Sequence, residues 1–260
     1  MVEVVGESGP AVLLLPGGAE AVDGFFPGLV EGLLADPGCR VLLYDRPGNG
    51  PSDEPDGLRV AADSLHDAIL EAGIGPVIAV GQSLGGAAAL LLAAQHPDDV
   101  AGLVLLDPTP INDPDLAAKV ARNARLSVKL FDAPVIGSLL RGMLRRSARK
   151  SAARHGMDAE TREAMLTITD LDAAKLGRAV VGIEDISRDL DLTGIRHVPA
   201  VVVTADRKPG DSIRRAHENL ATALGATLVS WPRAEHAVHL THPVEVLEEC
   251  RKLARTVASD

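Results

Sequence analysis

The chain has 260 residues, of which 46% are hydrophobic and 24% charged, and a net charge of −10 at pH 7. This length and composition are typical of one globular domain with a sizeable core and room for an insertion. The negative charge would repel nucleic-acid phosphates, and an aromatic content of 2% leaves few side chains on which bases could stack. The composition therefore argues against nucleic acid as a partner.

The number of cysteines and the length of the apolar runs argue against disulfide-rich, metal-cluster and membrane-spanning proteins. The two cysteines, Cys39 and Cys250, predict neither a disulfide framework nor a metal cluster. The first residues show no basic segment followed by an apolar one, and no apolar run approaches the length of a bilayer span. We therefore expect a cytoplasmic protein without a membrane partner, and the oligomeric state stays open.

Short apolar runs alternate with helix-forming stretches along most of the chain. Strands are predicted at residues 2–5, 11–15, 41–45, 77–80, 103–106, 200–204 and 227–230. Helices are predicted at about residues 25–34, 58–72, 87–94, 212–224 and 244–257. This alternation predicts an α/β fold with a doubly wound, mostly parallel sheet.

Residues 111–196 interrupt the alternation with polar, helical sequence that has almost no strand-like runs. The stretch is too long to be a connecting loop in a compact domain. We therefore predict a core made of residues 1–110 and 197–260, and an inserted helical cap made of residues 111–196.

The stretch Gly81–Gly85 reads Gly-Gln-Ser-Leu-Gly and fits the G-x-S-x-G pattern of a nucleophile elbow. A sharp strand-to-helix turn strains the backbone of the central serine, and side chains at the flanking glycines would clash. The turn also points Ser83 at the unpaired N–H groups of the following helix, which can hold an oxyanion. A strand and a helix flank the motif as required, so we predict that Ser83 is a nucleophile rather than part of a plain glycine turn.

Two further segments carry a family resemblance. Residues Asp45–Ser52 follow an Asp-x-x-Gly-x-Gly-x-Ser pattern, and His236 is followed by His-Leu three residues later and by a proline four residues beyond. With the elbow and the cap insertion, these segments resemble the α/β-hydrolase fold family over most of the chain. The resemblance implies that His236 is the general base, and that Glu235 replaces the glycine usual before it. We interpret the loop Asp45–Ser52 as structural.

A metal-binding alternative exists for the histidine segment. His236, His239 and His242 recur at every third residue. This spacing matches no recognised zinc pattern, and neither a carboxylate nor a cysteine stands out as a fourth ligand. We therefore expect no metal and no cofactor, and we interpret His239 and His242 as packing and surface residues.

The acid that would orient His236 has two candidates. Asp206 follows the predicted strand 200–204 and fits the chain order Ser…Asp…His, in which the acid holds the histidine in the correct tautomer. The resemblance also admits Asp107, because some relatives carry the acid after the preceding strand. We favour Asp206 and retain Asp107 as the alternative.

An oxyanion hole needs two N–H donors. Leu84, the residue after Ser83, is expected to supply one. Gly18, in the Pro-Gly-Gly sequence after the strand 11–15, occupies the position expected for the other. A simple glycine turn is the alternative reading of this sequence.

The predicted cap contains two series of cations spaced by four residues. They are Arg141, Arg145 and Arg149, and Arg146, Lys150 and Arg154. On a helix these residues form two adjacent basic stripes in an otherwise acidic protein. The simpler interpretation is a solvated helix face, and the alternative is attraction of an anionic substrate such as a coenzyme A or carrier-protein thioester.

These residues together predict a capped, esterase-like serine hydrolase. Its small-molecule acyl substrate would be a carboxylic ester, a thioester or a lactone, processed through an acyl-enzyme. Acyl transfer to another acceptor, perhydrolase or lyase chemistry, and a ligand receptor with a vestigial triad remain alternatives. The fold cannot decide among them, because function depends on the pocket.

Overall fold

A computed structural model describes residues 2–50, 57–170 and 172–259. Its centre is a sheet with the strand order β1-β3-β2-β4-β5-β6-β7. The strands are β1 (Val2–Val5), β2 (Ala11–Leu15), β3 (Arg40–Tyr44), β4 (Val77–Gln82), β5 (Val100–Leu106), β6 (Ala200–Val203) and β7 (Thr227–Val229). Strand β1 runs antiparallel to β3 and every other pair is parallel, which confirms the predicted α/β class.

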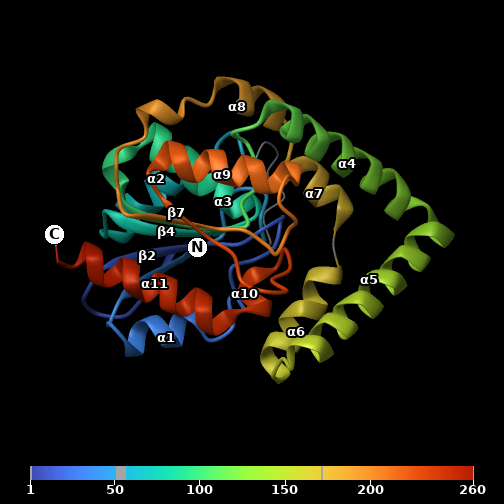
Figure 1. Ribbon diagram of the computed structural model, residues 1–260, viewed down its shortest axis with the longest axis horizontal. Helices are drawn as coiled ribbons and strands as arrows, with labels where there is room; N and C mark the ends of the chain where they lie inside the picture. Colours follow the sequence, from blue (N-terminus) through green and yellow to red (C-terminus); the bar gives the residue numbers. More distant parts are fainter. Residues whose placement is uncertain (1, 51–56, 171, 260) are drawn as a thin grey trace.

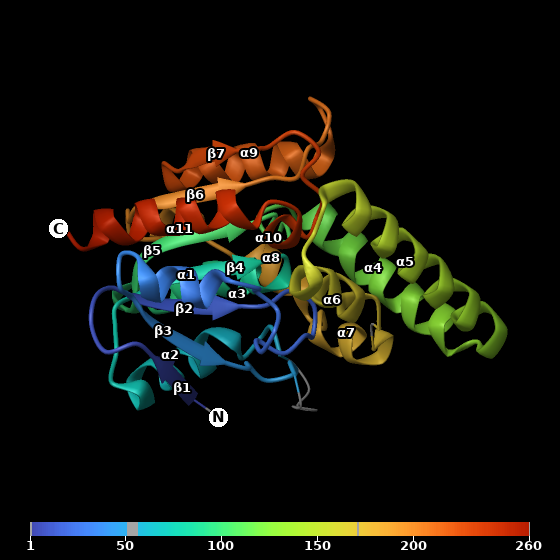
Figure 2. The same ribbon diagram turned by 90° about the horizontal axis from the view of Figure 1, so that it is seen from below.

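Helices cover both faces of the sheet (Figures 1 and 2). One face is covered by α2 (Ala61–Ala72), α3 (Leu84–Gln95) and α9 (Ser212–Leu224), and the other by α1 (Leu29–Ala35) and α11 (Pro243–Val257). The short α10 (Val238–Thr241) precedes α11, and the 3-10 turn η1 (Pro97–Asp99) follows α3. Apolar side chains from both faces of the strands form one core layer under each set of helices.

The central strand and the helix after it are almost completely buried. Every residue of β4 is buried, and so is every residue from Leu84 to Ala93 in α3. Burial on both faces explains why the β4 sequence is continuously apolar instead of alternating. The helix is buried all round because it lies between the sheet and α2, so its small alanines allow close packing.

Several helices lie between β5 and β6 in the chain. They are α4 (Pro114–Asp132), α5 (Pro134–His155), α6 (Ala159–Thr167), α7 (Ala173–Ala179) and α8 (Ile183–Asp189), with 3-10 turns η2 (Ile168–Asp170) and η3 (Leu192–Gly194). Helices α4 and α5 form a hairpin that projects away from the sheet, while α6 and α7 lie at its base (Figure 2). In the described part of the chain, no helix combines the length and apolar character needed to cross a bilayer.

Several element boundaries differ from the sequence-based prediction, and those of α1 and of the turn at Ser83 have a clear local cause. The helix expected from residue 25 begins only at Leu29, because Pro27 disfavours helical backbone before it and Gly28 has a φ of 69°. Strand β4 extends to Gln82 and α3 begins at Leu84, so a single residue, Ser83, makes the whole turn. This turn leaves no room at its flanking glycines.

We predict that Gly81→Ala destabilises the protein by about 3 kcal/mol or more, because overpacking against rigid atoms has a cost of this order. A Cβ at Gly81 would lie 2.4 Å from the carbonyl oxygen of Gly85. Gly142→Ala in α5 is the matched control, since a Cβ there meets nothing within 4 Å. It should leave stability unchanged or raise it by up to about 1 kcal/mol. Urea unfolding measures both, and an unshifted midpoint for Gly81→Ala would contradict the prediction.

Candidate active site

Ser83 forms the turn between β4 and α3 in a strained backbone conformation. Its φ is 50° and its ψ is −114°, a region that a residue with a side chain adopts at a cost of about 1–3 kcal/mol. Two hydrogen bonds hold the turn against the next strand. Ser83 N donates to Leu106 O at 3.0 Å, and Thr109 N donates to Ser83 O at 2.8 Å. The end of β5 thus supports the conformation that presents the Ser83 hydroxyl.

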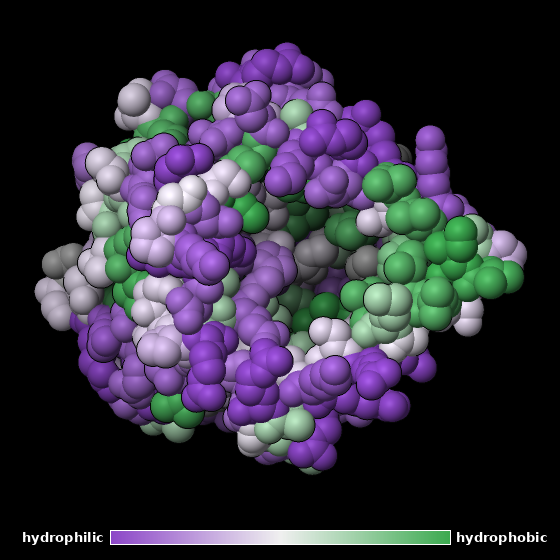
Figure 3. Space-filling model, turned by 45° about the vertical axis from the view of Figure 1, so that its right-hand side comes forward, coloured by the Kyte–Doolittle hydropathy of each residue, from purple (hydrophilic) through white to green (hydrophobic). Residues whose placement is uncertain are grey.

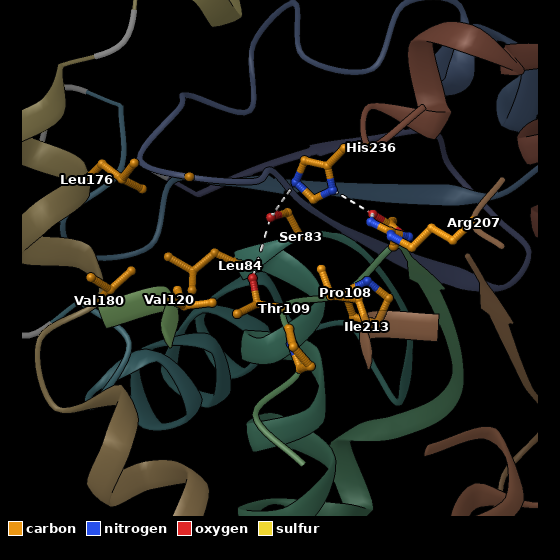
Figure 4. A pocket seen from close by; sticks show the side chains of 13 residues that line it. Ser83, Leu84, Pro108, Thr109, Val120, Leu176, Val180, Arg207, Ile213 and His236 are labelled. Atoms are coloured by element: carbon orange, nitrogen blue, oxygen red, sulfur yellow. Dashed lines mark hydrogen bonds and ion pairs between the residues drawn. The ribbon is translucent and has the colours of Figure 1, made fainter. Parts of the chain in front are cut away.

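His236 comes from the loop between β7 and α10 and reaches over Ser83 (Figure 4). Its Nε2 lies 3.0 Å from Ser83 Oγ. The loop is held in place from below, because Gln82 Nε2 donates to the carbonyl oxygen of His236 at 3.0 Å. The ring itself is 59% exposed, so it faces open space on the side where a substrate would approach.

Asp107, and not Asp206, is the carboxylate next to His236. Asp107 follows β5 with a φ of 46°, and its Oδ2 lies 2.6 Å from His236 Nδ1. Asp206 is exposed, and its carboxylate instead accepts a hydrogen bond from Arg233 N at 2.7 Å. The expectation that Asp206 pairs with His236 is therefore wrong. The reason is local, because the segment after β6 turns so that the Asp206 side chain stabilises the turn at Arg233.

The Asp107 carboxylate is buried and receives several hydrogen bonds. Arg207 binds it with both terminal nitrogens, of which Nη2 lies 2.6 Å from Oδ2, and Ala205 N donates to Oδ1 at 2.8 Å. Burial alone would raise the pKa of Asp107. Hydrogen bonds from Arg207 and His236 outweigh burial and hold this pKa well below its usual range. Asp107 therefore stays ionised beside the histidine.

A buried histidine, His217, packs beside Asp107 and stabilises the backbone around it. His217 in α9 donates from Nε2 to Pro108 O at 2.8 Å, so its Nδ1 accepts from Thr204 Oγ1 at 2.9 Å. Burial lowers the pKa of His217, which keeps the ring uncharged although Asp107 Oδ1 is 3.7 Å away. Sequence reasoning missed both Arg207 and His217. The one available signal was the position of Arg207, four residues after a buried strand on the side of the sheet where sites form.

Gly18 and Leu84 place two free N–H groups near Ser83. In the part of the chain that the structure describes, neither N–H donates to a protein acceptor. Gly18 has a φ of 57°; the carbonyl of Gly17, which shares a peptide unit with the Gly18 N–H, accepts from Glu20 N at 3.3 Å, and Arg46 Nη2 donates to the Gly18 carbonyl of the next peptide at 3.0 Å. A Cβ on Gly17 would lie 2.0 Å from Gln82 Oε1, so a larger residue there would displace the side chain that holds the His236 loop. The arrangement fits the expected oxyanion donors.

The loop that begins at Asp45 braces the oxyanion segment from behind. Asp45 Oδ1 accepts from Val22 N at 2.7 Å, and Asn49 Nδ2 donates to Glu20 O at 2.9 Å. Arg46 is fully buried, and burial lowers its pKa to about 10. These contacts are structural, as expected. Ser52, the last residue of this motif, lies outside the described residues.

Two cavities meet at the Ser83 hydroxyl and share Gly18, Ser83, Leu176 and His236. One has a volume of about 370 Å³ and is lined by Gly18, Ser83, Leu84, Asp107, Pro108, Thr109, Pro110, Val120, Leu176, Val180, Arg207, Ile213 and His236. The other, of about 320 Å³, lies below α5 and η2 and is lined in part by Phe25, Leu144 and Ile168. In the first cavity the two charged residues, Asp107 and Arg207, are paired with each other. Its remaining walls are mostly apolar (Figure 4).

The other histidines of the late segment have separate surroundings. His239 is buried and stacks on Phe25 at a ring distance of 4.5 Å, and burial lowers its pKa to about 3. His242 stacks on Trp231 at 5.6 Å. With His236 at Ser83, the three rings do not converge on one point.

A histidine cluster between α2 and η1 also has a metal-like composition. His66, His96 and Asp99 each offer a ligand atom within 4.8 Å of the others. The two rings stack with centroids 4.3 Å apart and planes 9° apart, so their lone pairs lie side by side instead of converging. One nitrogen of each ring already contacts a carboxylate, His66 Nδ1 with Asp99 at 2.6 Å and His96 Nε2 with Asp63 at 2.8 Å. Two stacked histidines, each hydrogen-bonded to a carboxylate, describe this cluster better than a metal site.

The fold and the cluster around Ser83 define a class of protein. A model of the family described as alpha/beta hydrolase fold matches residues 10–243. The chain therefore belongs to the α/β-hydrolase fold family.

Several related proteins are named as hydrolases, which indicates that this chain is a hydrolase as well. The 2-hydroxy-6-oxo-6-phenylhexa-2,4-dienoate hydrolase of Comamonas testosteroni is 26% identical over 251 residues, which cover 92% of this chain and 76% of that protein. A 2-hydroxy-6-oxononadienedioate/2-hydroxy-6-oxononatrienedioate hydrolase of the same organism is 32% identical over 139 residues. That match covers 50% of this chain and spans less than half of the relative, 48%. Proteins named lipase and esterase match over shorter stretches.

Solved structures share the fold. A thermophilic esterase from Thermogutta terrifontis, described with malate bound, superposes with a TM-score of 0.73 over 99% of this chain and 93% of that chain. The two sequences are 21% identical, so the likeness concerns the fold alone.

We predict that Arg207→Met destabilises the protein by about 3 kcal/mol at pH 7, because it leaves a buried carboxylate with one charged partner fewer. The folded pKa of Asp107 lies below its unfolded value of about 3.9. Its stabilising contribution is therefore complete above about pH 5 and is lost as the pH falls through 4 and below. Urea unfolding from pH 7 to pH 3 should show the difference from wild type shrinking.

Two variants serve as controls for this measurement. Arg207→Lys keeps the charge without the two-pronged contact and should fall between wild type and Arg207→Met. Arg188→Met removes an exposed pair with Asp185 and should cost less than about 1 kcal/mol. A pH-independent loss in Arg207→Met would show that the ion pair with Asp107 is not the source of the stability.

Proposed function

We propose that the chain is a serine hydrolase of carboxylic esters, with Ser83 as nucleophile, His236 as general base and Asp107 as the orienting acid. The observation that carries the proposal is the continuous chain of contacts from Ser83 Oγ through His236 to Asp107 at a strained elbow. The membership of the α/β-hydrolase fold family and the relatives named as hydrolases, esterases and lipases support it.

The proposed mechanism follows from the proton positions in the resting site. Asp107 holds the proton of His236 on Nδ1, which leaves Nε2 free to accept the hydroxyl proton of Ser83. Ser83 Oγ then attacks the acyl carbonyl, and the N–H groups of Gly18 and Leu84 stabilise the oxyanion. His236 gives the proton to the leaving alcohol. Water repeats the sequence on the acyl-enzyme and releases the acid.

The cavity walls favour a substrate that is neutral and apolar near the scissile bond. Arg207 is the cation among the residues lining the larger cavity, and it is already bound to Asp107. A dienoate such as those in the names of the Comamonas relatives carries a carboxylate, which would find no uncommitted Lys or Arg among the described residues of this lining. A volume of about 370 Å³ lies near the lower end of the usual range for ligand pockets, about 300–1,000 Å³, which favours short to medium acyl chains.

We predict that p-nitrophenyl esters of short to medium fatty acids are hydrolysed and that Ser83→Ala abolishes turnover. Asp107→Asn should lower kcat/KM by about 10⁴-fold, because the amide favours the wrong histidine tautomer. Asp206→Asn is the matched control and should stay within a few-fold of wild type, since its side chain contacts Arg233 N and not His236. Initial rates over the acyl series measure all four proteins.

The opposite pattern of the two aspartate variants would return the acid role to Asp206. Absence of turnover on every ester, with cleavage of a carbon–carbon bond in a 2-hydroxy-6-oxo-dienoate, would replace the ester proposal with the reaction class of the Comamonas relatives. Saturable binding of an acyl compound without product would favour the receptor alternative.

A further inference from the structure

The outer side of α5 exposes a group of large apolar side chains. Val135, Ile136, Leu139 and Met143 have exposed fractions of 82%, 47%, 65% and 61%. Single exposed apolar residues are ordinary, but a contiguous group on one helix marks an interaction surface. Figure 3 shows this apolar surface gathered on the projecting end of the α4–α5 hairpin, beside a hollow in the molecule. We call these four residues the apolar tip.

The same side of the helix becomes basic toward its C-terminal end. Val135, Leu139 and Met143 are spaced by four residues, and Arg146 and Lys150 continue that line at spacings of three and four. Arg146, Arg149 and Lys150 are exposed, and within the described residues none of them forms an ion pair. Helix α5 contains no acidic residue, although the whole chain carries a net charge of −10. We call these three cations the basic collar.

Two other cations of α5, Arg145 and Arg154, anchor the helix to the body of the protein, while Arg141 lies over the ring of Phe131. Arg145 binds Asp170 at 2.5 Å, and Arg154 binds Glu235 at 2.9 Å. Ser151 Oγ also donates to Glu235 at 2.8 Å. The helix is thus held at its inner side and base, while the apolar tip and the basic collar face outward. This division explains why only part of the two basic stripes is available to a partner.

Helix α5 also contributes an apolar side chain to a cavity of the candidate active site. Leu144, the neighbour of Met143, is 39% exposed and also lines the cavity of about 320 Å³ that reaches Ser83 and His236. Leu144 projects about 100° round the helix from Met143. Because it is itself partly exposed, it extends the apolar lining of this cavity to the surface of α5.

An anionic lipid surface is the partner that matches both halves of this face. A second copy paired symmetrically through the apolar tip would bring two strongly basic helices together, which opposes association. A soluble anionic substrate would use the collar and leave the tip exposed. A bilayer with anionic headgroups accepts apolar side chains at the acyl boundary and pairs the cations beside them with phosphates.

We propose that the outer face of α5 docks reversibly on an anionic phospholipid bilayer, and that esters dissolved in the bilayer reach Ser83 through the cavity lined by Leu144. The docking is independent of the reaction, whereas the delivery of an ester rests on the proposed hydrolase function. The expectation of no membrane partner considered only segments long enough to span a bilayer, and a helix that lies on the surface needs no such length.

Vesicle co-sedimentation tests the docking. Wild type and Ser83→Ala should bind vesicles of phosphatidylcholine with 30% phosphatidylglycerol, and bind vesicles of phosphatidylcholine alone much more weakly. Raising NaCl to 0.5 M should release the protein, because the Debye length shortens to a few ångströms. Binding of Ser83→Ala shows that docking does not depend on turnover.

Two triple variants separate the contributions of the two halves. Arg146→Gln/Arg149→Gln/Lys150→Gln should weaken vesicle binding by about 100-fold, since each cation near an anionic surface contributes about fivefold. Val135→Ser/Leu139→Ser/Met143→Ser should weaken it by about tenfold or more. The matched controls, Lys208→Gln/Arg215→Gln and Leu70→Ser/Val244→Ser, change exposed residues elsewhere and should bind like wild type. Circular dichroism and unfolding midpoints verify that all variants fold.

The results that would overturn the docking are specific. They are no binding to the anionic vesicles, equal binding to neutral vesicles, or unchanged binding by both triple variants. A wild-type dimer that the apolar-tip variant converts to a monomer, without vesicle binding, would assign the face to a second copy instead.

Ester hydrolysis then tests delivery. Both triple variants should hydrolyse a soluble p-nitrophenyl ester like wild type, and hydrolyse an ester dissolved in anionic vesicles at least tenfold more slowly. Equal rates in vesicles would overturn the delivery route. If wild type docks but hydrolyses neither ester, the proposed function fails and the docking stands.

Discussion

The buried charge of Asp107 is the constraint on which the site depends. A carboxylate that is 1% exposed is tolerated only when hydrogen bonds and a counter-charge replace its lost water. Arg207 and Ala205 supply these from the segment after β6, and His236 supplies one from the loop after β7. The orientation of His236 toward Ser83 therefore depends on an ion pair that takes no part in the proposed proton transfers.

The register of the parallel strands brings the two ends of this chain of contacts together. Gln82 on β4 pairs with Leu106 on β5, which pairs with Val203 on β6. The next residues, Ser83 and Asp107, therefore leave the sheet at the same edge. Both have positive φ values, so each chain turns away sharply and its side chain stays over the edge. Regular sheet geometry positions the reactive groups, and backbone strain at the two turns directs them.

Local sequence was sufficient for the fold and for the parts of the site that are defined by their own turns. The G-x-S-x-G motif located the Ser83 turn, and the late segment located His236, because the required geometry is encoded within a few neighbouring residues. The carboxylate that contacts His236 could not be identified from local sequence. Asp107 and Asp206 both follow buried strands, and only the three-dimensional path after β6 decides which faces His236. Arg207 and His217 escaped prediction because their partner, Asp107, is about a hundred residues away in the chain.

Helix α5 contacts the segment that carries His236 through Glu235. The family resemblance places a glycine before the histidine, and the carboxylate found there instead ties Ser151 and Arg154 to the residue next to His236. Charge periodicity alone revealed the basic stripes but could not show which cations were already used in anchoring. Once Arg145 and Arg154 are assigned to anchors, the unpaired cations lie beside exposed apolar residues and not on a uniformly solvated face. The inner side of the helix thus supports the histidine loop through Glu235, while its outer face carries the apolar tip and the basic collar.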